Sequence, residues 1–140
     1  MNLEIAKEKA ISYLMISKKT EYEVREKLKK LKCEDDVIEK VIQSLINLNY
    51  INDSDYVDAY IRQCMRLLNY SVFEIKQKLL QKGIKKYIIE EKIENSDLKE
   101  YEISLINKLL TTKLKSYEPL KQKQYLFRRG FKLDSLNEEY

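Results

Sequence analysis

The residues of this sequence that could bind a ligand are mostly lysines and arginines, and they recur in three separate segments. Residues 18–32 hold seven basic and three acidic residues, residues 71–86 hold five and one, and residues 113–132 hold seven and one. Such side chains bind phosphates and carboxylates, so the pattern indicates a polyanion or an acidic protein surface as partner. The candidate binding residues are Arg25, Lys29, Lys30, Arg62, Arg66, Lys76, Lys78, Lys82, Lys85, Lys86, Lys121, Lys123, Arg128 and Arg129.

The stretch YLFRRGF, from Tyr125 to Phe131, shows why each of these residues has two explanations. Arg128 and Arg129 could reach a phosphate or carboxylate, because the guanidinium group pairs with both in a bidentate manner. Cations at the end of a helix also oppose the negative end of its dipole, which needs no ligand. No pattern of Arg, Asn and Gln typical of a recognition helix is present, so any nucleic-acid contact is expected to lack sequence specificity.

The residue types needed for catalysis are largely missing. The chain has no histidine, no glycine-rich phosphate loop and no G-x-S-x-G segment, so we expect a protein that is not an enzyme and needs no cofactor. Cys33 and Cys64 lack metal-ligand spacing, and we expect them to be small core residues. No signal sequence and no apolar run of about 18 residues is found, which predicts a cytoplasmic protein.

An internal repeat places the basic segments on equivalent elements. At an offset of 51, residues 20–42 align with residues 71–93, so that Thr20 meets Ser71 and Glu23 meets Glu74. Each pair forms an S/T-x-x-E capping box, which begins a helix. A looser third copy follows at an offset of 47, with Glu118-Pro119 at the start of the helix, Gly130 in the place of Gly83 and Ser135-Leu136 in the place of Ile88-Ile89.

The repeat predicts an all-α protein of three tandem three-helix units, about nine helices, in an elongated and curved array. The leading helices are expected at residues 3–17, 54–68 and 97–113, with Asp53 or Ser54 as the N-cap of the second. The units are expected at residues 1–52, 53–96 and 97–140, the last with a shortened final helix.

The chain has 11 tyrosines and 3 phenylalanines, which could stack on single-stranded bases. More often such residues fill the seams between helices, and we expect this of Tyr22, Tyr50, Tyr56, Tyr60 and Phe131. Tyr70, at a predicted helix junction, is the aromatic residue that we expect to be most exposed.

With these features in place, the sequence resembles the RecX family, the regulators of the bacterial recombinase RecA. The matching segments are LINLNYINDSDYVDAYIRQ, IKQKLLQKGI and YLFRRGF, in the order and spacing of the family. Asn49 stands where the family commonly has glycine, and asparagine also tolerates the left-handed conformation.

The resemblance implies a protein, expected here to be a monomer, that binds RecA along the groove of the RecA–DNA filament. It further implies inhibition or modulation of recombinase, ATPase and coprotease activities in DNA repair and the SOS response. Single- or double-stranded DNA would be bound weakly. The alternative is a helical DNA-binding protein whose units work in the manner of helix-turn-helix motifs.

Overall fold

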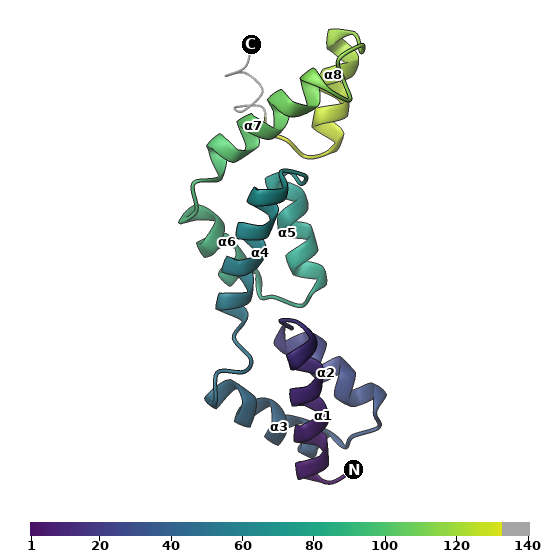
Figure 1. The fold of residues 1–140 in the computed structure, drawn as a ribbon, viewed down its shortest axis with the longest axis vertical. Helices are drawn as coiled ribbons and strands as arrows, with labels where there is room; N and C mark the ends of the chain where they lie inside the picture. The colour runs from purple at the N-terminus through teal and green to yellow at the C-terminus, as the bar shows by residue number, and fades with distance from the viewer. Residues whose placement is uncertain (133–140) are drawn as a thin grey trace.

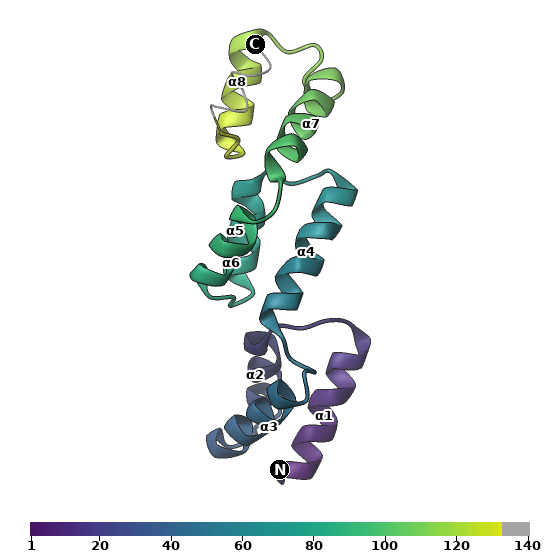
Figure 2. The ribbon, with the colours of Figure 1, turned by 90° about the vertical axis from the view of Figure 1, so that its left-hand side faces the viewer.

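The computed structural model describes residues 1–132 as an elongated array of helices (Figure 1). The eight helices are α1 (Leu3–Ile16), α2 (Glu21–Lys30), α3 (Asp35–Asn47), α4 (Asp53–Leu67), α5 (Val72–Gln81), α6 (Lys86–Glu94), α7 (Leu98–Thr111) and α8 (Pro119–Arg128). We call α1–α3 the first repeat, α4–α6 the second, and α7 with α8 the third. The repeats follow one another along the long axis in both views (Figures 1 and 2). The predicted all-α architecture of tandem repeats is confirmed.

One detail of the predicted helices differs from the structure, and another is not tested by it. The predicted ninth helix, like the match at Ser135-Leu136, falls in residues 133–140 and lies outside the described residues. The N-cap of α4 is Asn52, whose side chain accepts a hydrogen bond from the N–H of Asp55 (3.0 Å), so the prediction of Asp53 or Ser54 is wrong. Asp53 is instead the first helical residue of α4, and its carboxylate accepts a hydrogen bond from the N–H of Glu21 in the first repeat. The limits predicted for the repeats at residues 52 and 96 stay a prediction.

The start of the second helix in each of the first two repeats is fixed by the capping box read from the sequence. The hydroxyl of Thr20 accepts the N–H of Glu23 while the Glu23 carboxylate accepts the N–H of Thr20. Ser71 and Glu74 repeat this arrangement at the start of α5. Each box satisfies two backbone N–H groups that a helix leaves unpaired.

The same two hydroxyls also connect neighbouring repeats. Thr20 and Ser71 are fully buried, and each donates a hydrogen bond to a backbone carbonyl at the end of the second helix in the next repeat. Thr20 donates to the carbonyl of Lys82 (2.7 Å), and Ser71 to that of Arg129 (2.6 Å). We call these contacts the first and the second joint. The repeats are therefore stacked by matched contacts between residues far apart in the chain.

Both joints also receive a carboxylate from the leading helix of the next repeat. Asp53 accepts the N–H of Glu21, the first residue of α2 (2.9 Å). Glu102 accepts the N–H of Val72, the first residue of α5 (3.1 Å), and with its other oxygen the N–H of Lys132 (3.0 Å). Glu102 is only 2% exposed, so these bonds are what make its burial tolerable.

The two glycines of the chain lie at the joints. Gly83 and Gly130 have φ values of +80° and +84°, and a Cβ on Gly130 would lie 2.6 Å from the Cβ of Phe73. A Cβ on Gly83 would likewise collide with the side chain of Tyr22. Lys32 occupies the equivalent position in the first repeat with φ +65°. Positive φ alone thus does not demand glycine here; the close approach of the preceding repeat does.

The apolar core is not continuous along the array but consists of two separate clusters. The first repeat has a core of its own, in which Ala6, Val24 and Leu45 are fully buried. The second and third repeats share one continuous core that runs from Tyr56 to Phe131. Cys33 and Cys64 are buried thiols without a disulfide, which confirms their prediction as core residues. The first joint therefore depends on polar contacts more than the second.

Substitution of Gly130 by alanine is expected to lower the free energy of unfolding by about 2 kcal/mol, because the new Cβ overlaps Phe73 and adds strain at positive φ. Lys32 also has a positive φ, but it is exposed and no preceding repeat packs against it in the described residues. Lys32→Gly is therefore expected to leave the free energy of unfolding unchanged or to raise it by about 1 kcal/mol. Urea unfolding followed by circular dichroism measures both, with Lys32→Ala as control. Equal small effects at all of these positions would contradict the close approach as the reason for glycine.

Candidate interaction surface

The predicted binding residues gather on the second helix of each repeat. The basic helices α2, α5 and α8 succeed one another along the right-hand side of the array in Figure 1. The structure places the candidates as follows: Arg25, Lys29 and Lys30 in α2; Arg62 and Arg66 in α4; Lys76 and Lys78 in α5 with Lys82 at its C-cap; Lys85 and Lys86 at the start of α6; Lys121, Lys123 and Arg128 in α8 with Arg129 at its C-cap.

One basic position recurs in all three of these helices. Arg25, Lys76 and Lys123 each lie five residues after the N-cap, at Thr20, Ser71 and Glu118 respectively. Since α2, α5 and α8 follow one another along the array, this basic position recurs along its length (Figure 1). A recurring row of basic positions is suited to an extended anionic surface rather than to a small ligand.

Some of the candidate residues already form ion pairs with acidic side chains of the chain itself. Arg25 pairs with Glu21 (3.2 Å) and with Glu39, and the Lys29 ammonium lies 3.4 Å from Glu26. These are exposed or half-exposed pairs, which contribute little to stability and can be exchanged for another anion.

Six candidates are exposed and make no hydrogen bond or ion pair within residues 1–132. They are Lys30 in α2, Arg62 and Arg66 in α4, Lys85 before α6, and Lys121 and Arg128 in α8. They represent all three repeats, so a partner lying along the array could meet a cation in each. Their contact with any partner stays a prediction.

Lys82 and Arg129 have a structural role that the sequence did not indicate. Lys82 lies 3.8 Å from Glu23, and Arg129 lies 2.6 Å from Glu74. Each is the residue before a joint glycine, and each pairs with the capping-box glutamate of the preceding repeat. The adjacent arginines of YLFRRGF thus divide: Arg128 is exposed, whereas Arg129 belongs to the second joint.

The Arg129 pair is the better formed of the two. Its guanidinium donates to both oxygens of Glu74 and also to the backbone carbonyl of Asn69 (2.7 Å). Burial on its own raises the pKa of Glu74, but hydrogen bonds from Arg129 and Ser71 outweigh it, so the pKa lies below its ordinary value of 4.5. The Glu74–Arg129 pair is therefore ionised and held in one geometry at neutral pH.

The aromatic residues follow the predictions only in part. Tyr56 and Phe131 are buried, as predicted. Tyr70 is not the exposed aromatic that we predicted, because its backbone N–H and carbonyl both bond the hydroxyl of Tyr101 and its side chain packs against the core. Tyr50, predicted in a seam, is 50% exposed.

A cleft that sequence reasoning missed lies at the first joint. Its larger part has a volume of about 310 Å³ and is lined by Lys18, Tyr60 and Gln63 among others. A smaller hollow of about 120 Å³ continues it toward Tyr50, and the two parts share Lys18 and Tyr56. The position of Lys18 just before the first capping box was the only sequence signal for this site.

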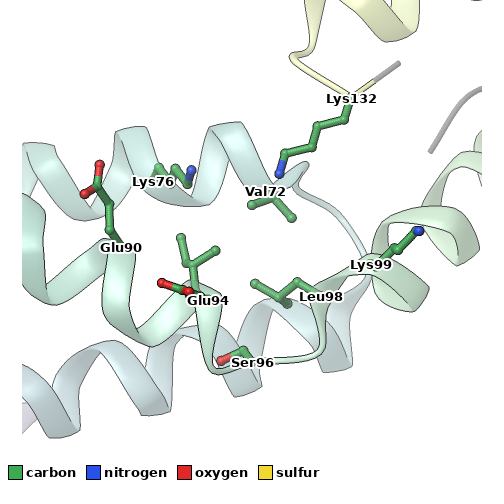
Figure 3. Close-up of a pocket in the computed structure, with 9 residues that line it drawn as sticks. Val72, Lys76, Glu90, Glu94, Ser96, Leu98, Lys99 and Lys132 are labelled. Carbon is green, nitrogen blue, oxygen red and sulfur yellow. The ribbon is translucent and has the colours of Figure 1, made fainter. Parts of the chain in front are cut away.

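Another cavity, of about 530 Å³, lies between α5, α6 and the beginning of α7 (Figure 3). Val72 and Leu98 supply apolar surface, and Lys132 extends over it from the segment after α8. Its rim carries Glu90 and Glu94 as well as lysines, so the cavity does not favour a ligand of one charge.

The described part of the chain offers little to a metal ion or a membrane. Residues 1–132 contain no group of three or more histidine, cysteine, aspartate or glutamate side chains arranged to hold a metal. Within the same range, none of the helices combines the length and the apolar character needed to cross a bilayer.

Comparison with known proteins fits both the repeats and their order. Residues 6–45 match the family description "RecX, first three-helix domain" and residues 52–93 match "RecX, second three-helix domain". The crystal structure of RecX from Lactobacillus salivarius is 32% identical, with a TM-score of 0.83 over 97% of this chain and 92% of that one. This chain belongs to the RecX family.

Curated RecX proteins are similar as well, and they carry the name "Regulatory protein RecX". The Streptococcus uberis protein is 34% identical over 137 residues, which cover 89% of this chain and 50% of that protein. The RecX of Bacillus cytotoxicus is 33% identical over 132 residues and is covered to 48%. The chain thus spans about half the length of these RecX relatives, and its family is one of regulatory proteins.

The two arginines of the RecX segment YLFRRGF are expected to differ in their effect on stability. Arg129→Ala breaks three hydrogen bonds of a charged group at the second joint and should lower the free energy of unfolding by about 2 kcal/mol. Arg128→Ala removes an exposed side chain and should change it by no more than about 0.5 kcal/mol. Urea unfolding of both variants checks this, and a larger loss for Arg128→Ala would contradict the assignment.

The second joint is also expected to weaken in acid. The native pKa of Glu74 lies below its ordinary value of 4.5. The stability that the ionised Glu74 adds to the fold is therefore complete at neutral pH, and it is lost as the pH falls from 4.5 through the native pKa. Wild type should therefore lose more unfolding free energy between about pH 6 and about pH 3 than Glu74→Gln does. Glu91→Gln, an exposed substitution on α6, is the control and should follow the wild type.

Proposed function

We propose that this chain is a regulator that binds RecA and lies along the groove of the RecA–DNA filament, inhibiting or modulating the activities of RecA in DNA repair and the SOS response. Membership of the RecX family supports the choice of partner. The observation that carries the proposal at the level of residues is the row of basic positions repeated on α2, α5 and α8.

The shape of the array suits such a partner. A filament groove is long, and it exposes acidic protein surface together with DNA phosphates. An elongated chain with a cation in every repeat can make several weak contacts at once, and linked contacts add to a useful affinity although each is weak. Phosphates in the groove, and weak binding of DNA without sequence specificity, are part of the same proposal.

The proposed mechanism is occupation of the groove and requires no catalytic step by this chain. Stable joints keep the repeats in register, so that the cations of one repeat are positioned relative to those of the next. A preorganised array loses less conformational freedom on binding than a flexible one. Regulation would then follow from competition with whatever else must enter the groove.

Charge reversal of Lys30, Lys85 and Arg128 together is expected to weaken inhibition of the RecA ATPase on single-stranded DNA by about tenfold, since each exposed contact is worth up to about 1 kcal/mol. None of these residues makes a hydrogen bond or ion pair at a joint, and circular dichroism should show an unchanged fold. The measurement is ATP hydrolysis by RecA as a function of the concentration of this protein.

The matched control reverses Lys7, Lys9 and Lys40, which lie on α1 and α3 and change the net charge by the same amount. Equal losses in both triple variants would mean that net charge alone matters and would contradict an ordered interface. Tight, sequence-specific binding of duplex DNA with no effect on RecA would instead favour the alternative of a DNA-binding protein.

A further inference from the structure

The two joints differ in one respect that the repeat does not predict. At the second joint, Arg129 donates to the backbone carbonyl of Asn69, in the connector before α5. Lys18 is the residue equivalent to Asn69 in the first repeat, at the offset of 51. Within residues 1–132, no side chain of the second repeat bonds the connector 17–19. The place that Arg129 fills at the second joint is open at the first.

The side chain equivalent to Arg129 explains the opening. Lys82 turns toward Glu23 (3.8 Å) and lies 5.9 Å from the centre of the Tyr56 ring. The Lys82 ammonium is directed at Glu23 and Tyr56 and bonds no carbonyl of the connector 17–19, so it does not close the space. What remains is the cleft described above, with Lys18 and Lys82 on its walls.

The lining of the cleft favours an anion. Lys18 is exposed and makes no hydrogen bond or ion pair within the described residues, and Lys19 stands beside it. The single acidic residue among those that line the two parts is Asp55, in the smaller hollow. Lys19 is less available, since its ammonium bonds the Ser17 carbonyl (3.2 Å) and lies over Tyr13.

An exposed aromatic ring also lines the smaller hollow. Tyr50 is half exposed and lines the smaller hollow with the side-chain amides of Asn49 and Asn52. Asn49 holds φ +61°, and the backbone N–H of Tyr50 bonds the carbonyl of Leu45 (2.8 Å), so the ring is carried on a fixed turn. Cations that follow an open groove beside an exposed ring are the combination that holds unpaired bases and their phosphates.

We propose that the cleft at the first joint is a subsite for single-stranded nucleic acid, with a backbone phosphate against Lys18 and an unpaired base stacked on Tyr50. The two hollows share Lys18 and Tyr56, so a strand can occupy both at once, which favours a strand over a free nucleotide. The subsite deepens the weak nucleic-acid binding proposed above, and it involves no contact with RecA.

The test measures binding of the whole chain to a fluorescent oligothymidylate about 15 nucleotides long, by anisotropy and without RecA. Tyr50→Ala should weaken binding about fivefold or more, and Tyr50→Phe, which keeps the ring, should bind as wild type. Lys18→Gln should weaken binding and reduce the slope of log affinity against log salt by about 0.7. Exposed positions outside the cleft supply matched controls, Tyr117→Ala and Lys40→Gln, which should stay within about twofold of wild type.

Changes in the amide chemical shifts of the protein on titration with different ligands show which class of ligand the cleft binds. Oligothymidylate should shift residues around Lys18 and Tyr50, while thymidine monophosphate, inorganic phosphate, duplex DNA and an oligoglutamate peptide should shift them far less at equal concentration. If the monophosphate or the peptide binds there as tightly, the cleft is a nucleotide or carboxylate site and the proposal is wrong. Equal losses in cleft and control variants would also overturn it.

Failure of this subsite and failure of the proposed function give different results. Loss of oligothymidylate binding in Tyr50→Ala, with RecA ATPase inhibition retained, would support the subsite and separate it from the filament interface. Normal oligothymidylate binding in that variant would overturn the subsite whatever the effect on RecA.

Discussion

The buried hydroxyl groups of Thr20 and Ser71 hold this array together. Each accepts a hydrogen bond from a backbone N–H of its own helix and donates one to a carbonyl of the next repeat. A hydroxyl is among the few side-chain groups able to do both at once. Because these groups are fully buried, leaving either bond unmade would cost free energy, which ties the start of one helix to the end of another.

The joints also decide how the positive charge of the chain is used. Each takes one cation, Lys82 or Arg129, to neutralise the glutamate of a capping box. Other cations of these segments, among them Lys30, Lys121 and Arg128, remain exposed at the surface. A basic segment that looks uniform in sequence is thus divided into residues that hold the repeats in register and residues exposed to a partner.

The two joints are built from the same parts but differ in strength. The second has the bidentate Arg129–Glu74 pair and a core that continues from the second repeat into the third. The first has a lysine at 3.8 Å from its glutamate, and the core of the first repeat is separate. We infer that the open cleft at the first joint follows from this difference, since Lys82 does not bond the connector before the first capping box as Arg129 bonds the connector before the second.

Much of the fold was determined by the sequence alone, because it depends on local rules. A few neighbouring residues specify each capping box, the buried stripe of each second helix, and the chain reversals after Gly83 and Gly130. Because these patterns recur in successive repeats, they could be recognised with more certainty than a single copy would allow. The family could be recognised from three such segments. The N-cap of α4 was misplaced by one or two residues because Asn52, Asp53 and Ser54 are all good capping residues.

Only the tertiary structure decided what individual side chains do across a joint. The partners of Arg129 lie 55 and 60 residues away, and that of Thr20 lies 62 residues away, so no local pattern connects them. For the same reason, sequence could not tell that Gly130 is required by Phe73 whereas Lys32 shares its φ without glycine. Local chemistry set the helices and their ends, and packing between distant segments set which charges, rings and cavities reach the surface.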